Sequence, residues 1–181
     1  MMENVFLRNQ RHSKFSWESL SQPRIQEGRG DLGEDMPVMV HRMAQSALLD
    51  VLSEIHGEKQ ANEYFRKAGY LAGSEFARNV LDLNVDFNTF LANLQQQYLI
   101  LKVGVLRVES CDLATGNFVL TVGEDLACSG LPVTNETVCH FDVGFFSGIF
   151  EIYTGKKYDL QEIDCWATGA RVCRFQGISL K

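Results

Sequence analysis

Three cysteines and one glutamate near the C-terminus constrain the fold of this chain more than any other feature: Cys139, Glu162, Cys165 and Cys173. If a three-residue hairpin loop joins the strands that carry Cys165 and Cys173, these two residues lie directly opposite each other, with Cβ atoms roughly 5 Å apart. That distance suits two thiolates on one metal ion, or a disulfide. Cys139 and Glu162 would then complete the four ligands of a structural zinc site.

The spacing of these residues leaves alternatives open. Glu162 and Cys165 are three positions apart, so a regular strand would direct their side chains to opposite faces of the sheet. The four-ligand set therefore requires a bulge or bend between them. The alternatives are three buried thiols beside a solvated Glu162, and a Cys165–Cys173 disulfide. An odd total of five cysteines argues against complete pairing, and we expect Cys111 and Cys128 to be small core or strand residues.

Length and composition indicate one main domain. The chain has 181 residues, is 45% hydrophobic and contains 12 Phe, which is enough for a single core. We expect residues 34–181 to form that domain and residues 1–33 to be an N-terminal arm or linker. A net charge of −6 argues against nucleic acid as a partner. We find neither a membrane span nor a secretory signal, so we expect a cytoplasmic location.

Hydrophobic periodicity changes along the chain. Apolar residues at helical spacing predict four helices, over about 38–56, 58–80, 86–101 and 141–153. Period-two alternation predicts strands over about 103–111 and 117–122, and a C-terminal hairpin of strands 157–167 and 171–178. This segregation predicts an α+β fold in which helices pack on one face of an antiparallel sheet and the last β-hairpin carries the metal site.

Two of the predicted helices carry glycines four positions apart. These pairs are Gly69 with Gly73 and Gly144 with Gly148. Each pair creates a smooth helix face that lets another backbone come close. Such a face serves either helix packing within the chain or a contact with a second subunit.

The C-terminal region carries a specific pattern: Cys139-His-Phe-Asp-Val-Gly144, Tyr153-Thr-Gly155-Lys, Glu162-x-x-Cys165 and Val172-Cys173-Arg-Phe175. This pattern resembles the 4-vinyl reductase domain family, and the resemblance spans about residues 33–178. It implies an α+β domain, usually dimeric, that buries an apolar ligand between helices and sheet. The similar sensor modules of aromatic-responsive bacterial activators hold zinc through three cysteines and a glutamate. On matching positions these ligands are Cys139, Glu162, Cys165 and Cys173.

A ligand pocket in such a fold would be apolar, with a few polar anchors. The candidate lining residues are aromatic: Phe90, Tyr98, Phe118, Phe146, Phe150 and Trp166. The alternative is that these side chains only fill the core. Phe90 and Phe118 stand near the positions of the polar anchors in the phenol-type sensors, which favours a ligand more apolar than phenol.

Together these features favour a zinc-stabilised domain that binds an apolar or aromatic small molecule, as a homodimeric sensor or carrier. One alternative is a tetrapyrrole-related enzyme or chaperone, as the family name suggests; another is a protein-interaction module without a ligand. The sequence has no Gly-x-Gly-x-x-Gly after a strand, no phosphate loop and no Ser/His/Asp set. We therefore expect binding rather than catalysis and assign no catalytic residue.

Overall fold

The computed structural model describes residues 15–20, 25–112 and 114–180. The chain divides into two compact units, Met1–Asp35 and Met36–Lys181, each of which is described by itself. The described part of the first unit holds two short helices, α1 (Trp17–Leu20) and α2 (Ile25–Gly28). The second unit contains the sheet, the long helices and every residue of the predicted metal and ligand sites.

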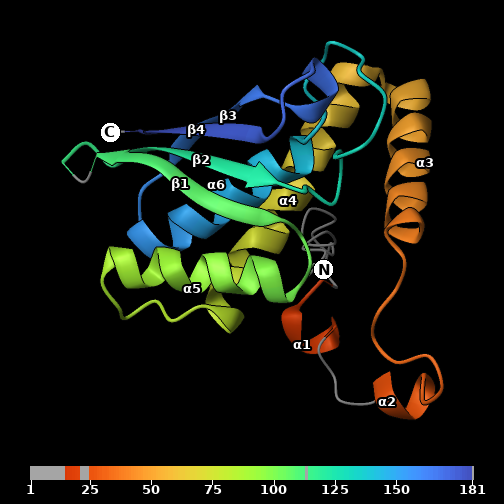
Figure 1. Cartoon of the computed structure of the whole chain (residues 1–181), viewed down its shortest axis with the longest axis horizontal. Coiled ribbons are helices and arrows are strands. Elements are labelled where there is room, and N and C mark those ends of the chain that lie inside the picture. The colour runs from red at the N-terminus through yellow and green to blue at the C-terminus, as the bar shows by residue number, and fades with distance from the viewer. Residues whose placement is uncertain (1–14, 21–24, 113, 181) are drawn as a thin grey trace, which may run out of the picture. The chain divides into compact units, whose positions relative to one another are not determined.

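The second unit is an α+β domain, as predicted. Its helices are α3 (Val38–His56), α4 (Glu58–Val80), α5 (Phe87–Ile100) and α6 (His140–Thr154). Its strands are β1 (Val105–Asp112), β2 (Asn117–Gly123), β3 (Tyr158–Asp164) and β4 (Cys173–Ser179). The strands form one antiparallel sheet in the order β1-β2-β4-β3. Figure 1 shows α4, α5 and α6 on one face of this sheet.

The C-terminal hairpin differs from its prediction in one respect. The predicted three-residue loop is wrong, because β3 ends at Asp164 and a single 3-10 turn, Trp166–Thr168, follows before β4. Two hydrogen bonds hold this turn: the Cys165 N–H donates to the Thr168 hydroxyl, and that hydroxyl donates to the Cys165 carbonyl. The strand irregularity that the ligand set required is present, as a register shift between Glu162 and Asp164.

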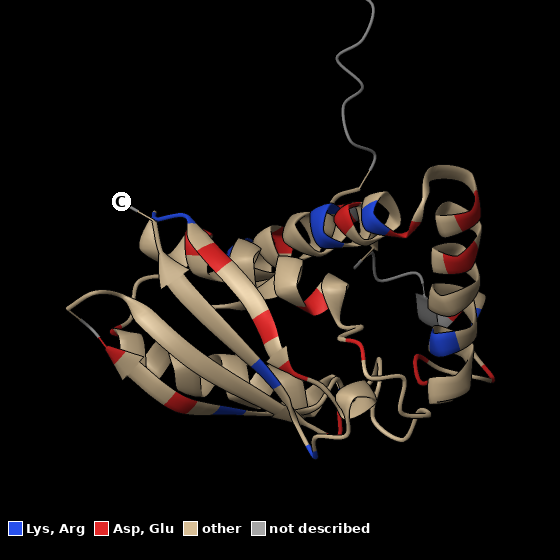
Figure 2. Cartoon of the chain, turned by 90° about the horizontal axis from the view of Figure 1, so that it is seen from above, with Lys and Arg blue, Asp and Glu red and all other residues tan. Residues whose placement is uncertain are grey.

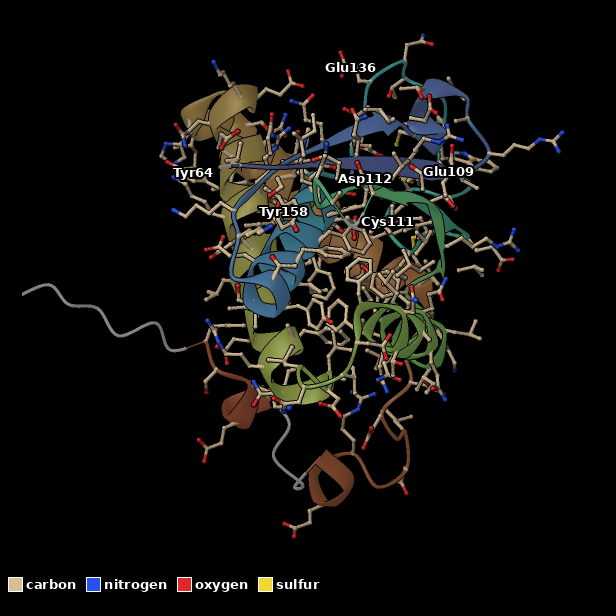
Figure 3. All side chains as sticks on the ribbon, turned by 90° about the vertical axis from the view of Figure 1, so that its left-hand side faces the viewer. Tyr64, Glu109, Cys111, Asp112, Glu136 and Tyr158 are labelled. Carbon is tan, nitrogen blue, oxygen red and sulfur yellow. The ribbon has the colours of Figure 1, made fainter. Side chains whose placement is uncertain are left out.

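Charged side chains of both signs are scattered over the helices and strands (Figure 2). On the sheet, Arg174 of β4 forms ion pairs with Glu109 of β1 and with Asp164 of β3. Cys111 lies on β1 between Glu109 and Asp112 (Figure 3), and its side chain is half-buried. Within the described ranges, no helix is both long enough and apolar enough to cross a membrane.

The two glycine pairs pack α4 directly against α6. A Cβ on Gly69 would overlap the carbonyl oxygen of Phe141, and a Cβ on Gly144 would overlap that of Arg66. Gly73 and Gly148 are equally crowded by the backbone of the facing helix. The smooth faces therefore serve packing within the chain, and they no longer support a dimer contact.

Replacing Gly144 with alanine should destabilise the domain strongly. The added methyl group would meet backbone atoms of α4, which no rotamer change can move aside. We expect Gly144→Ala to lower the free energy of unfolding by about 3 kcal/mol, at the upper end of the range for overpacking. Gly123→Ala is the control, because its methyl group would make only ordinary contacts. Equal urea-denaturation midpoints for the two variants would contradict the close helix crossing.

Candidate metal centre

Four cysteine sulfurs meet at one end of the sheet. Cys128 comes from the loop after β2, Cys139 immediately precedes α6, Cys165 follows β3, and Cys173 is the first residue of β4. All four side chains are buried, and their sulfur atoms all lie within 4.8 Å of one another. The cluster can therefore hold a metal ion through side chains from four separate segments.

The sulfur spacing fits a tetrahedral ion better than a disulfide. The Sγ of Cys139 lies 3.9 Å from that of Cys165 and 3.7 Å from that of Cys173. The Sγ of Cys128 lies 4.0 Å from that of Cys165 and 3.1 Å from that of Cys173. A tetrahedral ion with metal–sulfur bonds of about 2.3 Å separates its sulfurs by about 3.8 Å, and three of the four distances are close to that value. All four cysteines are free, so the alternative Cys165–Cys173 disulfide is not formed.

Glu162 lies beside this cluster. Its Oε2 accepts a hydrogen bond of 2.9 Å from the Cys139 backbone N–H, at the start of α6. Its Oε1 is buried and has no hydrogen-bond partner among the described residues. Burial, together with the neighbouring Cys165, raises the pKa of Glu162 to about 8. The carboxyl group therefore links β3 to α6 and keeps one oxygen without a partner next to the sulfurs.

The sulfurs perturb one another strongly. Contact with Cys128, and with the other two thiols, raises the pKa of Cys139 and lowers that of Cys165. Without a cation, the four groups would share protons between closely packed sulfurs. A divalent ion would replace those protons, since thiolates are the form that binds metals.

Cys128 belongs to the cluster, although we expected only a small core residue. A turn closed by Asp125 positions it: the Asp125 Oδ1 accepts hydrogen bonds from the backbone N–H groups of Ala127, at 2.8 Å, and Cys128, at 3.1 Å. A cysteine in a loop three residues after an aspartate was the available signal. Its partners lie 45 residues along the chain at Cys173 and 37 at Cys165, so local spacing could not reveal them.

Five of the six predicted ligand-binding aromatics lie in the core: Phe90, Tyr98, Phe118, Phe146 and Phe150. Their rings pack closely, with centroid distances of 4.1 Å between Phe118 and Phe150 and 5.5 Å between Tyr98 and Phe146. Trp166 is held separately, because its indole N–H donates to the Leu131 carbonyl at 2.9 Å. A role of these residues in ligand binding stays a prediction.

Known proteins similar to this chain fall into one group. A family model for the vinyl-4-reductase domain matches residues 118–178. An uncharacterised protein of Methanocaldococcus jannaschii, MJ1642, is 30% identical over 59% of this chain and 60% of its own length. The transcriptional regulatory protein XylR of Pseudomonas putida is 25% identical over 83% of this chain and 28% of its own length. The chain therefore spans less than two thirds of these curated relatives.

Solved structures share the fold at low sequence identity. The phenol-responsive sensory domain of the transcription activator PoxR, solved with phenol, has a TM-score of 0.64 at 19% identity, over 81% of this chain and 78% of that one. A vinyl-4-reductase family protein from Methanocaldococcus jannaschii has a TM-score of 0.62 at 12% identity, over 100% of this chain and 98% of that one. The trafficking protein particle complex subunit 3 of Naegleria fowleri, covalently bound to palmitic acid, has a TM-score of 0.63 at 10% identity, over 80% and 95% of the two chains. The family resemblance found in the sequence is thus confirmed, and the chain carries a vinyl-4-reductase domain at residues 118–178.

Proposed function

We propose that this protein binds an apolar or aromatic small molecule, as a sensor or carrier, and that a zinc ion in the cysteine cluster holds the binding domain in shape. The observation that carries the proposal is the set of four buried sulfurs at near-tetrahedral spacing beside a core of stacked aromatic rings. Four protein ligands leave no open position on the ion, so its role is structural.

We propose Cys128, Cys139, Cys165 and Cys173 as the zinc ligands. The predicted set has Glu162 in place of Cys128, and it remains the alternative. Four sulfurs are favoured because each already lies within 4.8 Å of the other three, and because Glu162 already accepts a hydrogen bond from the backbone of Cys139. In this arrangement Glu162 orients a ligand rather than binding the ion itself.

Single substitutions should distinguish these two ligand sets. Cys128→Ser should weaken zinc binding by roughly 100-fold or more, because the fourth thiolate is lost. Glu162→Gln should retain the ion, since the amide oxygen can still accept from the Cys139 N–H. Competition with a chromophoric chelator measures both affinities, and Cys111→Ser, on β1 outside the cluster, is the control. A larger loss in Glu162→Gln than in Cys128→Ser would assign the fourth position to Glu162.

The proposal of a small apolar ligand rests on the core and on the relatives. Two solved structures with this fold contain phenol and palmitic acid, respectively. Here the core is rich in aromatic side chains, such as Phe90, Phe118 and Phe150. The tetrapyrrole-related and interaction-module alternatives, like the cytoplasmic location, stay predictions.

Retention of a small molecule through purification tests this function. We expect native mass spectrometry of the full chain to show, besides the metal, an added mass that denaturing spectra lack. Adding apolar and aromatic compounds to the protein after that molecule is removed should raise the unfolding temperature, because a ligand that binds only the folded state stabilises it. A chain that carries no added mass and responds to no compound in a broad screen would contradict the proposal.

We further propose that the protein is a homodimer and that α3 forms the contact. No residue of this 19-residue helix is buried. Its half-buried side, with His41, Gln45 and Leu49, faces the rest of the unit, while an apolar stripe points away. That stripe contains Val40, Met43, Leu48, Val51 and Ile55, with exposed fractions from 44% to 65%. A helix face of this kind is typical of a subunit contact.

A charge within the apolar stripe should separate the subunits. We expect Val51→Glu to convert the dimer into a monomer, because the carboxylate would have to lose its hydration in the contact. Size-exclusion chromatography with light scattering measures the change. Ser46→Glu adds the same charge on another side of α3 and should leave the dimer intact. A wild-type protein that is monomeric at micromolar concentration would contradict the homodimer.

A further inference from the structure

A small cavity lies where α3, α5, α6 and the loop after β2 come together. Its volume is about 150 Å³. Most of its wall is apolar, formed by side chains such as Val103, Leu126, Phe141 and Phe145. An apolar cavity of about this volume accepts a molecule the size of benzene. The space therefore suits one small ring or a short branched aliphatic group.

Two polar groups that line this cavity lack partners. Tyr98 is 2% exposed and Asp142 is 7% exposed. The hydroxyl oxygen of Tyr98 and the Oδ2 of Asp142 have no hydrogen-bond partner among the described residues. Leaving such buried groups without partners costs about 1–3 kcal/mol each, and more for a charged one. A bound molecule that satisfies both would remove that cost.

The acidic groups around the cavity select the type of partner. The buried carboxyl groups of Asp125 and Asp142 both line it, and their oxygens lie within 4.8 Å of each other and of the Cys139 sulfur. No Lys or Arg among the described residues lines the cavity. The nearby guanidinium of Arg42 instead donates to the backbone carbonyl of Leu126, at 2.8 Å. The cavity thus offers two closely spaced carboxyl groups and lacks a cation of its own.

We propose that this cavity binds a small organic amine: an ammonium group on an apolar body about the size of one ring. The ammonium donates to the Asp142 Oδ2 and to the Tyr98 hydroxyl oxygen, and the rings of Phe141 and Phe145 pack against the apolar body. Burial raises the pKa of Asp142, and a cation beside this carboxyl favours its ionised form again. The inference rests on the proposed small-molecule function and adds the ligand class and its location. That location shares only Tyr98 with the aromatic set predicted from the sequence.

Benzylamine and benzyl alcohol are matched probes, since they share the apolar body and differ in charge. Isothermal titration of the metal-loaded full chain should show benzylamine binding roughly tenfold or more tightly than benzyl alcohol, because a hydrogen bond to a charged group contributes more. Asp142→Asn should weaken benzylamine binding by roughly tenfold or more. Tyr98→Phe should weaken it less. Asp159→Asn, an exposed carboxylate on β3, is the control and should bind as the wild type does.

Asp142→Asn should also keep its zinc and unfold at an unchanged or higher temperature without ligand, because it removes a buried carboxyl that has no partner. This readout separates a lost binding site from a misfolded protein. Equal affinity for both probes, benzylamine affinity unchanged in Asp142→Asn, or no benzylamine binding would overturn the inference. A second metal ion per chain that disappears in Asp142→Asn would assign the cavity to a metal cation and overturn it too.

The same titrations separate this inference from the broader function. If benzyl alcohol or another neutral apolar compound binds and Asp142→Asn leaves its affinity unchanged, the amine site fails and the small-molecule function stands. If no compound of any charge binds the full chain, both fail.

Discussion

The convergence of four buried cysteine side chains is the constraint on which the rest of this structure depends. The sulfurs come from a loop, the start of a helix, the end of one strand and the beginning of another, so they link segments that are far apart in the sequence. Thiolates so close together repel one another unless a cation or protons lie between them. A divalent ion resolves this repulsion and fixes the end of the sheet to the start of α6.

The start of α6 connects the metal centre to the cavity. Cys139 immediately precedes the helix, and Asp142 follows within its first turn, so the two side chains serve adjacent sites. The glycine crossing against α4 holds this helix rigidly, since backbone meets backbone along the contact. A ligand that draws on Asp142 would therefore act on the most firmly held helix of the domain. Such a position suits a protein that must transmit binding to a partner or to a second subunit.

The sequence was sufficient where local patterns decide the structure. Amphipathic spacing predicted all four long helices to within a few residues, and the need for an irregularity after Glu162 followed from strand parity alone. Contacts between distant segments decided the rest. The turn at Trp166 depends on its bond to the Leu131 carbonyl, and Cys128 joins the cluster through partners more than 35 residues away. The unpartnered oxygen of Asp142 appears only once the core is assembled.

X-ray absorption at the zinc edge of the purified, metal-loaded protein tests the central claim most directly. The four-cysteine centre predicts a single shell of four sulfur neighbours at about 2.3 Å, with no oxygen or nitrogen neighbour. Three sulfurs together with one oxygen at about 2.0–2.2 Å would show that Glu162, not Cys128, completes the site. A protein that contains no zinc would contradict the account as a whole.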